Sequence, residues 1–148
     1  MSRHHDITDL NNAVAYIILR VSRLLRLHLN RTLTELGVDI SPEQWFILFK
    51  LHNQTPLPQV ALADPVINDE PNIARLVRAL EKEGYVKRVA DENDRRQRLV
   101  SLTEDGQALM DRLLPAIIPV RETIFADIDD SEVEQLISIL HRLEANLP

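Results

Sequence analysis

The sequence predicts a mainly α-helical fold with one small β-hairpin, the wing, and three observations support this prediction. The 148 residues include only three glycines, one tryptophan, two tyrosines and three phenylalanines, a composition that favours helices over extensive sheet. Apolar residues recur at spacings of three and four along much of the chain, as in amphipathic helices. Two short β-branched or aromatic runs flank one hydrophilic segment. With 45% hydrophobic residues, the chain suffices for one core, so we expect a single domain over residues 1–148.

The first helix is expected from about Asp9 to Leu36, where Gly37 ends it. Its apolar stripe begins with Leu10, Val14 and Ile17. A helix this long and apolar is poorly suited to the surface of a small monomer. We therefore expect it to pack against a second copy of the chain.

Two further helices should follow. Ser41-Pro42-Glu43-Gln44 combines a capping serine, a proline in the first turn and a glutamine able to close a capping box. This second helix should stop before Thr55-Pro56. A short third helix is expected from Leu57 to Ala63, with Pro65 preventing its continuation.

A fourth helix and the hairpin form the next segment. Asn68 or Asp69 is expected to cap the helix, which Gly84 ends. The runs Tyr85–Val89 and Leu99–Leu102 are expected to pair as strands, with the hydrophilic stretch between them forming a protruding charged tip.

Two helices should close the chain. Thr103 is expected to cap the fifth helix, which Pro115 and Pro119 should kink. Ser131 begins a capping-box pattern that should open the last helix. That helix is strongly amphipathic, with Leu136, Leu140 and Leu143 on its apolar stripe.

Charge is distributed unevenly along the chain. The net charge is −6, but residues 72–98 hold eight basic and five acidic side chains, a net of +3. Residues 99–148 hold three arginines and ten acidic side chains, a net of −7. A basic strip on an acidic body suits a protein that touches DNA with one edge.

The composition argues against several kinds of site and function. The absence of cysteine excludes disulfides, thiolate metal sites and cysteine nucleophiles. The histidines are scattered, so we expect neither a metal site nor a cofactor. No glycine-rich phosphate loop or nucleophile arrangement suggests an enzyme. No apolar run is long enough to cross a bilayer, so we expect a cytoplasmic protein without a membrane partner.

Two short helices, an arginine-bearing helix and a basic hairpin follow the order of a winged helix-turn-helix. The run from Pro71 to Val86, the tip from Asp91 to Arg98 and the run from Leu99 to Gly106 resemble the MarR (multiple antibiotic resistance regulator) family. The long first helix, the Ser-Pro-Glu-Gln start of the second and the two closing helices follow the order of that family. The resemblance implies that residues 39–102 bind DNA.

The resemblance also assigns roles within the basic hairpin. Arg96 would enter the minor groove at the hairpin tip, and Asp94 would brace it by a charge-assisted hydrogen bond. Arg95 would be its neighbour at the DNA. Any one of Arg75, Arg78, Arg95 and Arg96 would ordinarily be a solvated surface residue, but their joint placement on the fourth helix and the hairpin tip favours contact with a polyanion.

The fourth helix would carry base recognition. Asn72 and Arg75 would face the major groove, and Arg78 would meet phosphate one turn later. Asp69 and Glu70 depart from this basic pattern near the DNA-facing start of the helix. They would repel phosphate unless they cap the helix or accept a hydrogen bond from a cytosine amino group.

The resemblance implies a homodimer, with residues 7–38 and 103–148 as dimerisation helices. Its interface would include the stripes of the first and last helices: Leu10, Val14, Ile17, Leu136, Leu140 and Leu143.

Family members often release DNA when a small, anionic aromatic compound binds between the dimerisation helices and the DNA-binding lobe. The candidate residues for such a site are Arg20, Arg23, His28, Trp45 and His52. Each could instead serve packing or salt bridges alone.

We therefore expect a sequence-specific regulator that binds double-stranded DNA at a pseudo-palindromic operator and blocks transcription until an effector releases it. The alternative is a winged-helix protein-interaction module that no longer reads DNA, which the acidic body and shortened third helix would permit.

Overall fold

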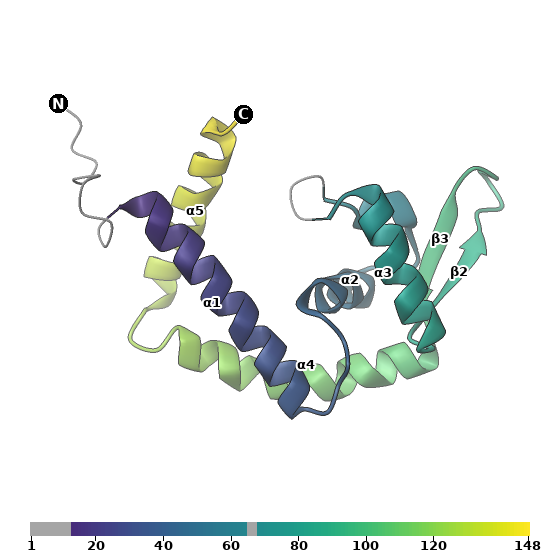
Figure 1. Ribbon diagram of the computed structural model, residues 1–148, viewed down its shortest axis with the longest axis horizontal. Helices are drawn as coiled ribbons and strands as arrows, with labels where there is room; N and C mark the ends of the chain where they lie inside the picture. The colour runs from purple at the N-terminus through teal and green to yellow at the C-terminus, as the bar shows by residue number, and fades with distance from the viewer. Residues whose placement is uncertain (1–12, 65–67) are drawn as a thin grey trace. The chain divides into compact units, whose positions relative to one another are not determined.

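The computed structural model describes residues 13–64 and 68–148, and it is mainly helical, as the sequence predicts (Figure 1). The chain divides into two compact units, Met1–Asp111 and Arg112–Pro148. Helix α4 belongs to both units, since the division falls within it. The elements are α1 (Val14–Glu35), α2 (Pro42–Asn53), β1 (Leu57–Pro58), the 3-10 turn η2 (Gln59–Leu62), α3 (Glu70–Lys82), β2 (Val86–Ala90), β3 (Arg98–Leu102), α4 (Glu104–Ile124) and α5 (Asp130–Asn146).

The first unit has a continuous apolar core. Its fully buried side chains include those of Leu33, Leu48, Leu51, Ile73, Val77, Leu80, Val86, Val100 and Met110. Each large aliphatic side chain removed from water contributes about 1.5–3 kcal/mol of transfer free energy. Ile73, Leu76, Val77 and Leu80 of α3 are buried in this core, and the opposite face of α3 therefore remains in solvent.

The first unit holds a three-stranded antiparallel sheet in the order β1-β3-β2. The predicted hairpin is present, with Val86 opposite Leu102 and Ala90 opposite Arg98. The helix predicted from Leu57 to Ala63 is present only as the 3-10 turn η2, and its predicted start is wrong, because Leu57 and Pro58 pair with β3. Proline disfavours the helical conformation of the residue before it, which leaves Leu57 extended. Pro65 lies outside the described residues.

Local capping signals account for most helix ends. The Ser41 capping box is present, with Gln44 N donating to Ser41 Oγ at 3.2 Å and Ser41 N donating to Gln44 Oε1 at 2.9 Å. Gly37 and Gly84 end their helices with φ of 75° and 83°, a conformation that glycine adopts without steric cost. Thr103 caps α4 by accepting from Gly106 N at 3.0 Å.

The predicted start of the last helix is two residues late. Asp129, rather than Ser131, caps α5 and closes a capping box with Glu132. Both residues have a glutamate three positions later, so the pattern alone fits two starts. A carboxylate interacts more strongly than a hydroxyl with the positive end of a helix. The Ser131 hydroxyl donates to Asp129 Oδ1 at 2.6 Å, and this bond lowers the pKa of Asp129, together with bonds from backbone amides.

The predicted dimerisation stripes are exposed on the single chain. On α1, Val14 and Ile17 are 43% and 41% exposed, while Leu10 lies outside the described residues. On α5, none of the residues is buried, and the exposed apolar side chains include Leu136, Leu140 and Leu143. Within the described ranges, no helix is long and apolar enough to span a membrane.

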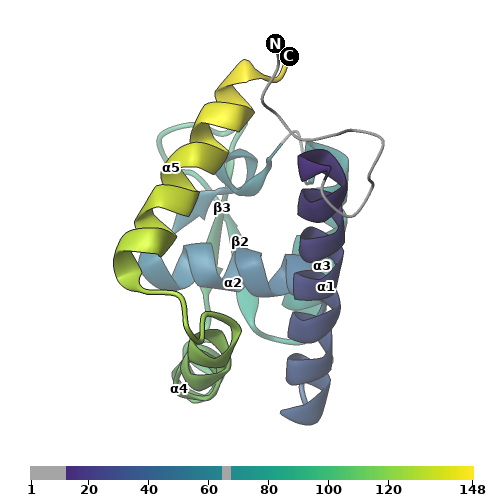
Figure 2. The ribbon, with the colours of Figure 1, turned by 90° about the vertical axis from the view of Figure 1, so that its left-hand side faces the viewer.

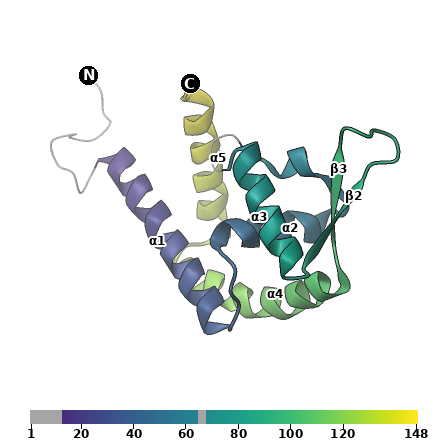
Figure 3. The ribbon, with the colours of Figure 1, turned by 45° about the vertical axis from the view of Figure 1, so that its right-hand side comes forward.

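The arrangement of the first unit is that of a winged helix. Figures 1 and 3 show the β2–β3 hairpin beside α3, with its tip and the N-terminal end of α3 on the same side of this unit. Figure 2 shows the N-terminal end of α2 beside α1, where Arg26 and Glu43 form a salt bridge. The start of α3 and the hairpin tip are therefore presented together.

Candidate nucleic-acid interface

Helix α3 presents two arginines opposite its buried face. Ile73, Leu76 and Val77 point into the core, so Arg75 and Arg78 on the other side of the helix are exposed. This division follows from the helical period, because buried positions 73, 76, 77 and 80 share one face while positions 75 and 78, three apart, share another.

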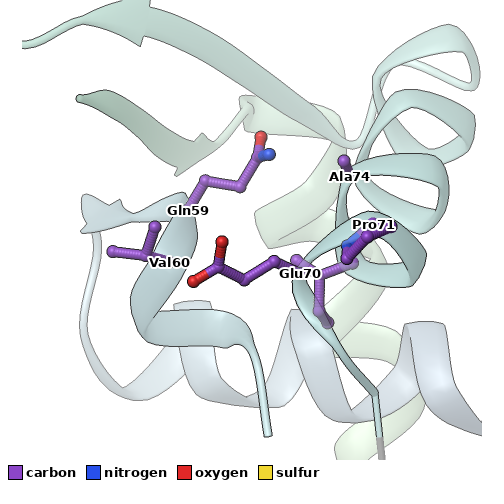
Figure 4. A pocket seen from close by; sticks show the side chains of 6 residues that line it. Gln59, Val60, Glu70, Pro71 and Ala74 are labelled. Carbon is purple, nitrogen blue, oxygen red and sulfur yellow. The ribbon is translucent and has the colours of Figure 1, made fainter. Parts of the chain in front are cut away.

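Asp69 is the N-cap of α3, and its carboxylate accepts from Asn72 N at 3.0 Å. One of the two acids at the start of this helix therefore has a structural role that a helix N-terminus favours. Glu70 is the first residue of the helix and extends into a hollow between η2 and α3 (Figure 4).

A chain of side-chain hydrogen bonds runs along the first turn of α3. Asn72 Nδ2 donates to Asn68 Oδ1, and Asn72 Oδ1 accepts from a terminal guanidinium nitrogen of Arg75 at 2.7 Å. Asn68 is only 8% exposed, whereas Arg75 is exposed. The chain therefore connects a buried amide to a guanidinium at the surface.

A salt bridge joins the other end of α3 to the hairpin. Arg88 on β2 donates to Glu81 Oε1 through a guanidinium nitrogen at 3.0 Å, and its backbone N–H donates to Glu81 Oε2 at 3.2 Å. Hydrogen bonding from the Arg88 side chain, aided by its charge, lowers the pKa of Glu81 although burial opposes this. The Glu81–Arg88 pair therefore holds the hairpin against α3.

The hairpin tip is folded by its own hydrogen bonds. Asp91 N donates to the Gln97 carbonyl at 3.1 Å, and Gln97 N donates to the Asp94 carbonyl at 3.0 Å. Asp94 Oδ1 accepts from the backbone N–H of Arg96 at 3.0 Å. Asp94 thus holds the main chain of Arg96, whereas the sequence suggested a bond to its side chain. The side chains of Arg95 and Arg96 are exposed.

A polar pocket of about 470 Å³ lies between α1, α2 and the start of α3. Its lining includes the Arg26–Glu43 pair, whose two parallel bonds measure 2.9 and 3.1 Å. Burial alone would raise the pKa of Glu43, but hydrogen bonds from Arg26, a backbone amide and Ser41, with the Arg26 charge, lower it overall. The remaining lining residues are Ser41, Gln44, Asn68, Asn72, Arg75 and Leu76.

A second hollow of about 320 Å³ separates η2 from the start of α3 (Figure 4). Gln59 and Glu70 extend into it from opposite sides. The buried Oε1 of Gln59 has no hydrogen-bond partner among the described residues.

The residues predicted to bind an effector lie on two helices, α1 and α2. Arg20, Arg23 and His28 are exposed on α1. Trp45 is 5% exposed and packs against Phe49 with ring centroids 6.0 Å apart. His52 Nδ1 lies 3.3 Å from Gln107 Nε2. None of the five predicted residues lines the 470 Å³ pocket.

Several residues that shape this surface have no clear signal in the sequence. The sequence suggests Asn68 only as a possible cap and predicts no role for Arg26 or Glu81. Asparagine four residues before another polar residue is a weak signal, because helix starts often contain one. In the described parts of the chain, no group of three histidine, aspartate or glutamate side chains could hold a metal ion.

Comparison with known proteins agrees with this geometry. Residues 40–97 match the model of the MarR family. An uncharacterised HTH-type transcriptional regulator of Bacillus cereus is 31% identical over 99 residues, which are 67% of this chain and 65% of that protein. The match thus spans slightly less than two thirds of this relative.

Solved structures share the fold over nearly the whole chain. A probable transcriptional regulator from Pseudomonas aeruginosa is 28% identical, with a TM-score of 0.79 over 90% of this chain and 98% of that one. S. aureus MepR, in a complex with DNA, is 23% identical, with a TM-score of 0.80 over 91% and 98%. CouR from Rhodococcus jostii RHA1, bound to p-coumaroyl-CoA, is 24% identical, with a TM-score of 0.78 over 90% and 93%. Residues 40–97 thus match the MarR family, and the chain shares its fold with these solved proteins.

Proposed function

We propose that this protein is a transcription regulator that binds double-stranded DNA in a sequence-specific manner. The observation that carries the proposal is the placement of exposed arginines on two neighbouring elements. Arg75 and Arg78 lie on the outer face of α3, and Arg95 and Arg96 lie at the hairpin tip. The tip and the start of α3 lie on the same side of the first unit (Figure 3).

This arrangement fits the dimensions of B-DNA. The major groove admits an α-helix, and a hairpin beside that helix reaches the backbone and the neighbouring minor groove. Arg96 is assigned to the minor groove, and Arg78 to phosphate. The DNA complex of S. aureus MepR supports DNA binding, because that protein shares the fold.

We propose that the regulator acts as a homodimer, with residues 39–102 binding DNA and residues 7–38 and 103–148 forming the dimerisation helices. The exposed stripes on α1 and α5 support this arrangement, since uncovered apolar surface favours association. Two-fold symmetry would place the recognition helices about 34–36 Å apart, in successive major grooves of a pseudo-palindrome.

We further propose that the dimer represses transcription and that a small anionic aromatic compound releases it. The p-coumaroyl-CoA complex of CouR supports an aromatic, negatively charged effector class. Arg20, Arg23, His28, Trp45 and His52 remain the candidates from the sequence. The test titrates p-coumarate and salicylate into the DNA-bound protein. Unchanged fluorescence of Trp45, the only tryptophan, together with unchanged DNA affinity, would refute release by this class.

DNA binding is tested by gel shift and fluorescence anisotropy with the intergenic DNA beside the gene. Log affinity should fall linearly with log salt, by about 0.9 for each phosphate contact. Arg96→Ala should weaken binding and relax the preference for narrow A·T-rich minor grooves. The matched control is Arg142→Ala, which removes the same charge from an exposed position on α5 and should leave affinity unchanged.

A protein-interaction module without DNA recognition is the alternative function. It would bind its own intergenic DNA no more tightly than unrelated duplex of equal length. Arg96→Ala and Arg142→Ala would then have equal effects.

A further inference from the structure

Asn72 uses both ends of its side-chain amide within the protein. Its Nδ2 donates to Asn68 Oδ1, and its Oδ1 accepts from Arg75 at 2.7 Å. An asparagine that reads adenine directly needs the same two atoms, one to donate to N7 and one to accept from the N6 amino group. Direct reading by Asn72 would therefore compete with both internal bonds.

Asn68 provides a fixed anchor for this chain of bonds. It is 8% exposed, and its backbone exchanges two hydrogen bonds with the backbone of Asp64, at 2.7 and 2.8 Å. The main chain that carries the Asn68 side chain is thus held in place. Because Asn68 lies just before the N-cap Asp69, it is placed at the end of α3 that enters the groove in the proposed function.

Arg75 ends the chain of bonds at the surface. A guanidinium carries five N–H donors in a planar fork, so the bond to Asn72 leaves donors for another partner. Guanine presents two acceptors, O6 and N7, at the spacing that this fork matches. An arginine whose fork is already oriented loses less conformational freedom when it binds.

We propose that Arg75 is the specificity-determining residue of α3, that it recognises a guanine in the major groove, and that Asn72 and Asn68 are positioning residues that act through it. This inference rests on the proposed function. It replaces the expectation that Asn72 and Arg75 read bases side by side.

The test begins with selection of binding sites from a random duplex library by the full-length protein. Each guanine of the selected half-site is then replaced, one at a time, by 7-deazaguanine, which lacks the N7 acceptor. One position should show a loss of affinity of about 10- to 100-fold with the unchanged protein. At that position Arg75→Ala should bind guanine and 7-deazaguanine equally.

A double-mutant cycle separates positioning from direct reading. Asn72→Ala should lower the guanine preference about tenfold when Arg75 is present and should have no further effect on it in Arg75→Ala. The salt slope should not change, because neither asparagine meets phosphate. The matched control is Arg78→Ala, which should weaken binding to all sequences equally.

Two substitutions of Asn68 test the anchor. Asn68→Asp keeps an oxygen that can accept from Asn72 and should preserve the guanine preference. Asn68→Leu has a similar volume but no acceptor and should reduce the preference. Circular dichroism melting identifies any variant that fails to fold, and the Asn72→Ala cycle then decides the question without it.

The outcomes distinguish this inference from the proposed function. Additive effects of Asn72→Ala and Arg75→Ala, or loss of an adenine preference in Asn72→Ala, would overturn the positioning role while leaving sequence-specific DNA binding intact. A selection that enriches no sequence would overturn the proposed function, and the inference would fail with it.

Discussion

Replacing Gly106 with alanine tests how closely the first turn of α4 packs against the start of the hairpin. A Cβ atom at this position would lie 2.1 Å from the Tyr85 carbonyl oxygen and 3.1 Å from Leu102 Cδ2. The first distance is about 0.9 Å short of the 3.0 Å below which real Cβ contacts are essentially never seen. The obstacle is backbone, so the helix and the hairpin must move apart.

Two effects of opposite sign determine how far Gly106→Ala changes the free energy of unfolding. Alanine is favoured over glycine in a helix interior by about 1 kcal/mol. Overpacking costs about 1–3 kcal/mol, and occasionally more, and the rigid neighbour places this site at or above the upper limit. Moving α4 away from the hairpin would also strain two hydrogen bonds, from Thr103 N to the Tyr85 carbonyl and from Thr103 Oγ1 to the Gly84 carbonyl. We expect a net loss of about 2 kcal/mol in the free energy of unfolding.

The assay is urea and thermal unfolding at one fixed protomer concentration, because the proposed dimerisation would couple stability to concentration. The expected loss lowers the melting temperature by about 4–8 °C. The control is Gly84→Asn, since a Cβ at Gly84 meets nothing within 4 Å and asparagine tolerates the φ of 83° there. It should cost less than Gly106→Ala. An unchanged or higher melting temperature for Gly106→Ala would refute the reasoning.

The remaining predictions concern the two salt bridges and the apolar stripe of α1. Glu43→Gln should cost about 0.2–1 kcal/mol at pH 7, because Arg26 is half exposed. The pKa of Glu43 is lowered from 4.5, so the stability difference between the wild type and Glu43→Gln should be fully present above pH 4.5 and disappear as the pH falls through the lowered pKa. A stability difference that grows in acid would contradict this prediction. Glu81→Gln should speed amide hydrogen exchange in β2, because it weakens the bond to Arg88. It should weaken DNA binding less than Arg96→Ala does. Unchanged exchange would show that the Glu81–Arg88 pair does not hold the hairpin. Ile17→Glu should shift sedimentation toward monomer, and Leu19→Glu, off the predicted stripe, should not; equal shifts would exclude the stripe as the interface.

Helix ends and buried faces could be predicted where their causes are local. The Ser41 capping box, the ends at Gly37 and Gly84 and the cap at Thr103 each depend on residues within about four positions. The buried stripe of α3 follows from the helical period alone. Prediction failed where a local pattern allowed two answers. Asp129 and Ser131 both fit a capping box, and the segment from Leu57 is apolar enough for a helix but pairs with β3.

The order of the elements, the side of α3 that carries arginine and the basic character of the hairpin tip could be predicted, because these depend on residue type and spacing. The contacts that hold those arginines in place depend on tertiary packing. The contact of Gly106 with Tyr85 and the bond of Glu81 to Arg88 join different elements, so they exist only once the core has packed. The direction of the Asn72 amide, toward Asn68 on one side and Arg75 on the other, likewise depends on the placement of a residue outside the helix.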